Sequence, residues 1–150
     1  MAAIMTMTVT IAQQIAVVSE GDETTVYQTL QAAIEGARPG SVIYLPGGGF
    51  SISDEVKITK RLTIIGIGHN PNNDNVDGAT TISGNLFFNE GSSSSAVMGC
   101  YITGNICIGH DNAAVNDILI RYCNLNGVEA KKNLSRDHSK SVIYTISCSI

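Results

Sequence analysis

The sequence predicts an all-β solenoid, a coil of short parallel strands with one capping helix at its N-terminal end. A motif of the type Ile-Ser-Gly-Asn occurs three times in the second half of the chain, and a fourth copy begins near the C-terminus. Its apolar position recurs at spacings of 20, 23 and 25 residues: Ile82, Ile102, Leu125 and Ile150. Such a period is typical of solenoids, whose repeats bury their apolar faces by stacking on one another. The β-branched residues, Asn and Gly of the motif favour strands and turns.

The N-terminal residues 1–14 allow two interpretations. They are apolar and reach Ala12 before two glutamines, as the apolar part of a secretory signal does, but no Lys or Arg precedes Arg38 to supply the positive start. Threonines and apolar residues alternate over 6–11, which fits a first strand instead. The alternatives, a remnant of a signal peptide and a first strand, both stay open. The first of them predicts a secreted or cell-surface protein.

Residues 27–37 are predicted to form the single helix. Four apolar residues fall on one face of it at helical spacing: Leu30, Ala33, Ile34 and Ala37. Thr25 or Thr29 can provide the N-cap. The helix is expected to end at Arg38-Pro39-Gly40, because Pro and Gly terminate helices.

The rest of the chain is predicted to alternate between short strands and turns. The expected strands are 41–45, 50–53, 56–58, 62–67, 80–85, 96–98, 100–105, 118–120, 123–127 and 142–144. The expected loops and turns are 68–78, 89–95, 109–112 and 131–141. The coil is then expected to close every 20–25 residues, with two or three strands in each repeat.

The segments 29–48, 50–52 and 62–68 resemble the N-terminal cap and first rungs of right-handed parallel β-helix proteins, the pectin-lyase-like superfamily. The resemblance covers residues 25–150 and implies that the helix caps the open end of the coil. It is specific for the fold rather than for an activity, since the superfamily includes polysaccharide lyases and hydrolases, phage tailspikes and adhesins. The repeats are also similar to those of secreted proteins of gut Bacteroidetes.

The domain organisation predicted from these patterns is one β-helix domain over 25–150. The repeat that begins at Cys148 is incomplete, so we expect the domain to be truncated at its C-terminus. An uncovered last rung would present unpaired backbone groups, and self-association through that rung is the expected consequence.

Composition limits the partners that we expect. The net charge is −4 and only 15% of the residues are charged, whereas nucleic-acid binding requires clustered Lys and Arg. No segment approaches the length of a membrane span, about 20 apolar residues. We therefore expect no nucleic-acid partner and no membrane span, and the resemblance implies a polysaccharide or a cell-surface glycan as partner.

The chain has four cysteines, at positions 100, 107, 123 and 148. Three of them occupy the same position of the repeat, where parallel strands would stack them at the inter-strand spacing of about 4.8 Å. That distance permits a disulfide, but side chains in such a ladder are more often buried thiols. We expect thiols, with disulfides as the alternative.

The charged turn near the C-terminus contains the candidate binding residues Lys131, Lys132, Arg136 and Asp137. The resemblance implies a Lys or Arg base next to a uronate carboxylate, as in lyases of this fold. Only one rung offers such residues, so a solvated charged turn is the favoured interpretation. No catalytic residue is assigned.

The loop at 72–77 contains the candidate metal ligands Asp74 and Asp77. Oxygen donors suit Ca²⁺, but the full EF-hand pattern is absent and Asn and Asp also favour turns. A turn is the favoured interpretation, and calcium is the single cofactor considered. Asn85, Asn105 and Asn126 are expected to form a structural ladder between repeats, with sugar contact as the alternative.

The predicted function is a non-catalytic secreted or surface β-helix segment that serves as an adhesin or glycan-binding scaffold. The alternative is the N-terminal part of a polysaccharide lyase or glycoside hydrolase that acts on acidic polysaccharide. Charged groups on several stacked rungs would distinguish the enzyme from the scaffold.

Overall fold

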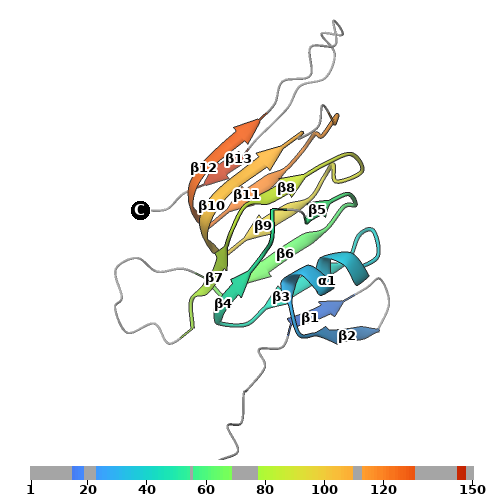
Figure 1. The fold of residues 1–150 in the computed structure, drawn as a ribbon, viewed down its shortest axis with the longest axis vertical. Helices are drawn as coiled ribbons and strands as arrows, with labels where there is room; N and C mark the ends of the chain where they lie inside the picture. The colour runs from blue at the N-terminus through green and yellow to red at the C-terminus, as the bar shows by residue number, and fades with distance from the viewer. Residues whose placement is uncertain are drawn as a thin grey trace, which may run out of the picture.

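A computed structural model describes residues 15–18, 23–54, 56–68, 78–109, 113–130 and 145–147. These residues form an all-β structure of mostly parallel strands with one helix. The strands stack along the long axis of the molecule, with α1, β1 and β2 near one end and β12 and β13 near the other (Figure 1). The predicted all-β class is therefore confirmed for the described part of the chain.

The first sheet contains seven strands in the order β13-β11-β9-β6-β3-β1-β2. Their bounds are Ile15–Val18 (β1), Thr24–Tyr27 (β2), Val42–Leu45 (β3), Thr63–Gly66 (β6), Ala96–Met98 (β9), Leu119–Arg121 (β11) and Thr145–Ser147 (β13). The strands from β3 to β13 pair in parallel, whereas β1 and β2 are antiparallel to their neighbours. The β1–β2 hairpin thus extends one edge of a parallel sheet.

The second sheet contains six strands, all of them parallel. Their bounds are Gly48–Ser51 (β4), Lys57–Ile58 (β5), Thr80–Ser83 (β7), Leu86–Phe88 (β8), Tyr101–Ile108 (β10) and Asn124–Ala130 (β12). Strand β10 pairs with β7 through its first residues and with β8 through its last, and β12 lies on its other side. The strands predicted at 100–105 and 123–127 are longer than expected. Strand β10 continues alongside β8, and β12 continues alongside the last residues of β10.

The repeats pair at their apolar position in the register that their sequence predicts, and the β10–β12 register then shifts by one residue, so that Asn105 is opposite Gly127. Ile102 on β10 is opposite Ile82 on β7 and Leu125 on β12, and Ile82 is also opposite Phe50 on β4. The Asn124 backbone N–H donates to the Cys100 carbonyl at 3.0 Å. Cys100 and Cys123, which directly precedes Asn124, therefore occupy equivalent places on neighbouring strands. The predicted stacking is confirmed for these copies, and the fourth copy at 148–150 lies outside the described residues.

One apolar core lies between the two sheets. Side chains from both sheets and from the helix belong to it, and its fully buried large members are Leu30, Ile34, Ile43, Leu45, Ile58, Leu62, Ile64, Ile82, Leu86, Phe88 and Ile102. Burial alternates along the strands, as in the buried Thr80 and Ile82 beside the more exposed Thr81 and Ser83. The other row of each strand therefore faces outward.

The helix α1 spans Leu30–Gly36 and packs against the β1–β2 hairpin. The Thr29 hydroxyl caps it by accepting the Ala32 N–H at 3.1 Å. At its other end, the Lys60 ammonium donates to the carbonyls of Glu35 and Ala37 at 2.9 and 2.8 Å. A cation at this end satisfies carbonyls that the helix leaves unpaired.

The helix is shorter than the predicted 27–37 because its expected first turn is extended. Tyr27 belongs to β2 and pairs with Ile15. A Cβ atom at Gly36 would lie within 2.7 Å of the Tyr27 ring, so the glycine allows the helix to sit directly on this strand. The predicted apolar face of the helix is confirmed, since Leu30, Ala33 and Ile34 are buried.

Candidate functional site

The predicted site residues lie outside the described part of the chain. This applies to the binding candidates Lys131, Lys132, Arg136 and Asp137 and to the metal candidates Asp74 and Asp77. A binding site in the charged turn and a calcium site in the loop at 72–77 therefore stay predictions. Among the described residues, no group of three His, Cys, Asp or Glu side chains is placed to hold a metal ion. No described helix is long and apolar enough to cross a membrane.

The second sheet presents an uncharged outer surface along β4, β7 and the first residues of β10 and β12. The inward residues there are apolar apart from Gly48 and Thr80, whereas the outward ones are small, hydroxylated or amide side chains around one tyrosine. We call this surface the polar face, and its members are Gly49, Ser51, Thr81, Ser83, Tyr101, Thr103, Asn124 and Asn126. Hydroxyl and amide groups both donate and accept hydrogen bonds, so this surface suits an uncharged ligand rich in hydroxyl groups.

Tyr101 lies in the middle of the polar face. It is half-buried and is opposite Thr81 on one side and Asn124 on the other. Two strands away, Gly49 pairs with Thr81, and a Cβ atom built at this glycine would meet nothing within 4 Å. The row therefore runs from open surface at Gly49 to an aromatic ring at Tyr101. The face of that ring can pack against a flat molecule.

An asparagine ladder borders the polar face where β7 and the first part of β10 end. The Asn85 amide oxygen accepts the Asn105 backbone N–H at 2.8 Å, and the Asn105 amide oxygen accepts the Asn126 amide N–H at 3.0 Å. The amide N–H groups of Asn85 and Asn105 donate to carboxylates, Asp54 at 3.0 Å and Glu129 at 2.6 Å. The predicted ladder between repeats is confirmed, and its bonds hold the strands in register.

A second outward row lies beyond the asparagine ladder. It consists of Lys57 on β5, Phe87 on β8, Cys107 on β10 and Glu129 on β12, which are successive partners across the strands. Cys107 is 9% exposed, although it belongs to the outward row. The ladder therefore separates an uncharged surface from one that carries charge.

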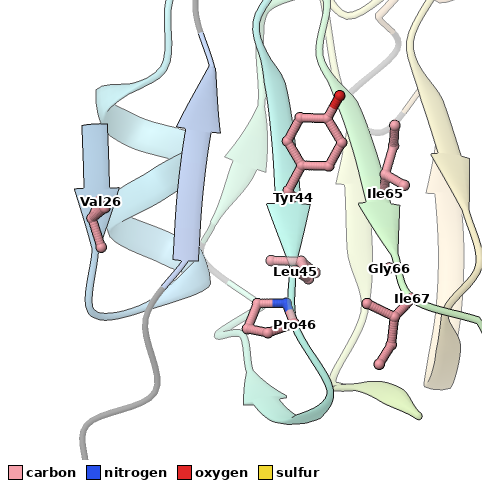
Figure 2. A pocket seen from close by; sticks show the side chains of 7 residues that line it. All are labelled: Val26, Tyr44, Leu45, Pro46, Ile65, Gly66 and Ile67. Atoms are coloured by element: carbon pink, nitrogen blue, oxygen red, sulfur yellow. The ribbon is translucent and has the colours of Figure 1, made fainter. Parts of the chain in front are cut away.

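The outer surface of the first sheet has an apolar hollow of about 400 Å³ (Figure 2). Its lining comes from β2, β3 and β6 and the residues just after them: Val26, Tyr44, Leu45, Pro46, Ile65, Gly66 and Ile67. Val26, Tyr44 and Ile67 are exposed there. The lining offers one side-chain hydroxyl group, that of Tyr44, and no charged side chain.

Cys100 and Cys123 are buried free thiols at equivalent places on neighbouring strands. Their sulfurs contact backbone carbonyls, those of Met98 at 3.4 Å and Arg121 at 3.2 Å. Burial, together with the neighbouring Cys123, raises the pKa of the Cys100 thiol from 9.0 to about 12, although a backbone hydrogen bond with Gly66 opposes the shift. The expected thiol ladder is thus observed for these two cysteines, and Cys148 lies outside the described residues.

The raised pKa of Cys100 predicts a loss of stability in alkali. Between pH 9 and 12 the unfolded chain releases the Cys100 proton and the folded chain retains it, so the free energy of unfolding falls as pH rises. The full shift corresponds to roughly 4 kcal/mol at about 1.4 kcal/mol per pKa unit. Urea unfolding at pH 8 and pH 11 should show a smaller decrease for Cys100→Ala than for the wild type. Equal decreases would contradict a neutral buried thiol.

Comparison of the chain with protein-family models, curated proteins and solved structures finds no match. Any functional assignment therefore depends on the chemistry of the described residues. Sequence reasoning missed Tyr101 as a functional candidate. Its signal was nevertheless present, because Tyr101 directly precedes the buried Ile102 of the motif and must then face outward in a strand.

Proposed function

We propose that the chain is a segment of a right-handed parallel β-helix that binds glycans through the polar face without cleaving them. The order of the strands supports the coil, since the chain passes from the first sheet to the second through β6, β7 and β8 and again through β9 and β10. Equivalent strands of these passes are parallel neighbours, as β6 and β9 are. Secretion or display at the cell surface is part of the same proposal.

The observation that carries the proposed function is the composition of the polar face around Tyr101. The face of an aromatic ring is electron-rich and can pack against the C–H groups of a sugar ring. Thr81 and Asn124, its neighbours across the strands, can exchange hydrogen bonds with sugar hydroxyls. The members of the face carry no carboxyl, amine or imidazole group, so they can bind a sugar but supply no pair of acid and base groups for cleavage of a glycosidic bond.

The experiment is a binding measurement with variants of Tyr101. Calorimetric titration of the full chain with a panel of plant, algal and host oligosaccharides should identify a ligand. Tyr101→Ala should weaken its binding about two- to tenfold, because an aromatic contact contributes about 0.5–1.5 kcal/mol. Tyr101→Phe retains the ring and should retain most of the affinity.

The matched control is Tyr44→Ala, which removes an exposed tyrosine from the outer surface of the other sheet. It should leave glycan binding unchanged. Failure of the whole panel to bind, or equal losses for Tyr101→Ala and Tyr44→Ala, would contradict the proposal. Release of unsaturated products from a polyuronate would instead favour the polysaccharide lyase.

A further inference from the structure

The polar face contains no charged residue, and the charges nearest to it along the asparagine ladder are carboxylates. Asp54 and Glu129 accept hydrogen bonds from Asn85 and Asn105 at the border of the face. Glu129 shares its row beyond the ladder with Lys57, but its carboxylate reaches back to Asn105, whereas Lys57 lies three strands away on β5. Together with the net charge of −4, this arrangement places negative potential beside the face.

We infer that the polar face takes a neutral glycan, a chain of uncharged hexose or pentose units, and not a polyuronate. This inference rests on the proposed function and specifies its ligand. A uronate chain would bring one carboxylate per sugar toward Asp54 and Glu129, where like charges repel. It would also lose hydration without gaining a cation from the members of the face, and an unpaired anion is costly to desolvate.

The spacing of the polar face indicates how such a glycan would lie. Equivalent outward residues on β4, β7, β10 and β12 follow one another at the inter-strand distance of about 4.8 Å. A glycan that runs across the strands along the Tyr101 row would meet open surface at Gly49 on β4 and one hydroxyl or amide group on each of β7, β10 and β12. Tyr101 lies on the third of these four strands, so its ring would hold an inner sugar of the bound segment.

The test compares neutral and acidic oligosaccharides of equal length on the wild-type chain. We expect gluco-, manno- or xylo-oligosaccharides to bind more tightly with each added unit up to about four, one for each strand of the face. Their affinity should not change between 50 mM and 500 mM NaCl, because no charge pair contributes. Oligogalacturonates and oligoguluronates should bind at least about tenfold more weakly than the best neutral series, an energy difference of about 1.4 kcal/mol.

A variant without the two carboxylates shows whether polyuronates bind weakly because of charge repulsion or because their shape does not fit the face. In the double variant Asp54→Asn, Glu129→Gln, both side chains keep an oxygen that can accept the asparagine N–H groups, but the two negative charges are removed. It should bind oligogalacturonate more tightly than the wild type at 50 mM NaCl and bind the neutral series equally well. A melting temperature close to that of the wild type will show that the ladder is preserved.

The outcomes distinguish the inference from the proposed function. Tighter binding of a polyuronate than of any neutral glycan, with loss on Tyr101→Ala, would overturn the inference and leave the proposed function in place. An unchanged polyuronate affinity in the double variant would overturn the electrostatic part of the inference. Absence of binding for both classes would overturn the proposed function itself.

Discussion

Replacement of Ile102 by Asp should unfold the described domain. Ile102 is 0% exposed and stands in the middle of the interior row, with Ile82 and Leu125 as its partners on β7 and β12. A carboxylate at this position would be buried without a partner, which costs several kcal/mol. We expect the free energy of unfolding to fall by at least about 4 kcal/mol, a large part of the stability of a typical domain. Circular dichroism during urea unfolding measures this loss.

Two further variants test whether the effect of Ile102→Asp depends on the position of the substituted residue. Thr103 is the next residue and is exposed on the polar face, so Thr103→Asp should change the stability by no more than about 1 kcal/mol. Leu125 continues the interior row but is only partly buried, so Leu125→Asp should have an intermediate effect. A folded Ile102→Asp variant with the wild-type unfolding midpoint would show that the register is wrong.

The interior row of apolar side chains could be predicted because it follows from a repeat period that is visible in the sequence. The apolar position of the motif repeats at Ile82, Ile102 and Leu125, and any stack of equivalent strands must bring these side chains together. The same logic placed Asn85 and Asn105 in a ladder. Elements that occur once in every repeat can therefore be predicted from sequence without knowledge of the tertiary structure.

The elements that were missed depend on contacts that occur once. The β1–β2 hairpin was not expected, because its strands are defined by pairing with each other and with β3 rather than by a repeat. Residues 24–27 could extend the helical pattern on one side, yet their β-branched and aromatic residues favour an extended chain once a partner strand is present. Strand β8 was also missed, since only three residues lie between Gly84-Asn85 and the turn at 89–95, a run too short to predict as a strand without its neighbours β5 and β10.

The candidate site was less predictable than the fold for a physical reason. The predicted candidates Lys131, Lys132, Arg136 and Asp137 are charged residues close together in the sequence, a pattern that is visible without the fold. The polar face, in contrast, is made of residue types that are common in turns and on strand surfaces. Its character emerges only when the pairing of β7, β10 and β12 gathers these residues into one surface around Tyr101.

The second large effect is expected at Gly84, where the chain turns from β7 toward β8. Gly84 has a φ of +125°, a conformation that residues with a Cβ atom rarely adopt. A Cβ atom here would also collide with the Ile52 carbonyl oxygen on the neighbouring segment. Neither Gly84 nor the Ile52 backbone can move freely, because the Ile52 N–H donates to the Ser83 carbonyl at 3.0 Å.

Gly84→Ala should therefore destabilise the domain by about 3 kcal/mol, through the strained backbone and the steric conflict together. The matched control is Gly49→Ala on the neighbouring strand β4, where an added Cβ atom meets nothing within 4 Å. We expect the control to stay within about 1 kcal/mol of the wild type. The two midpoints in urea measure the difference. Equal stability of the two variants would mean that β4 and β7 are not held together at this turn as the structure places them.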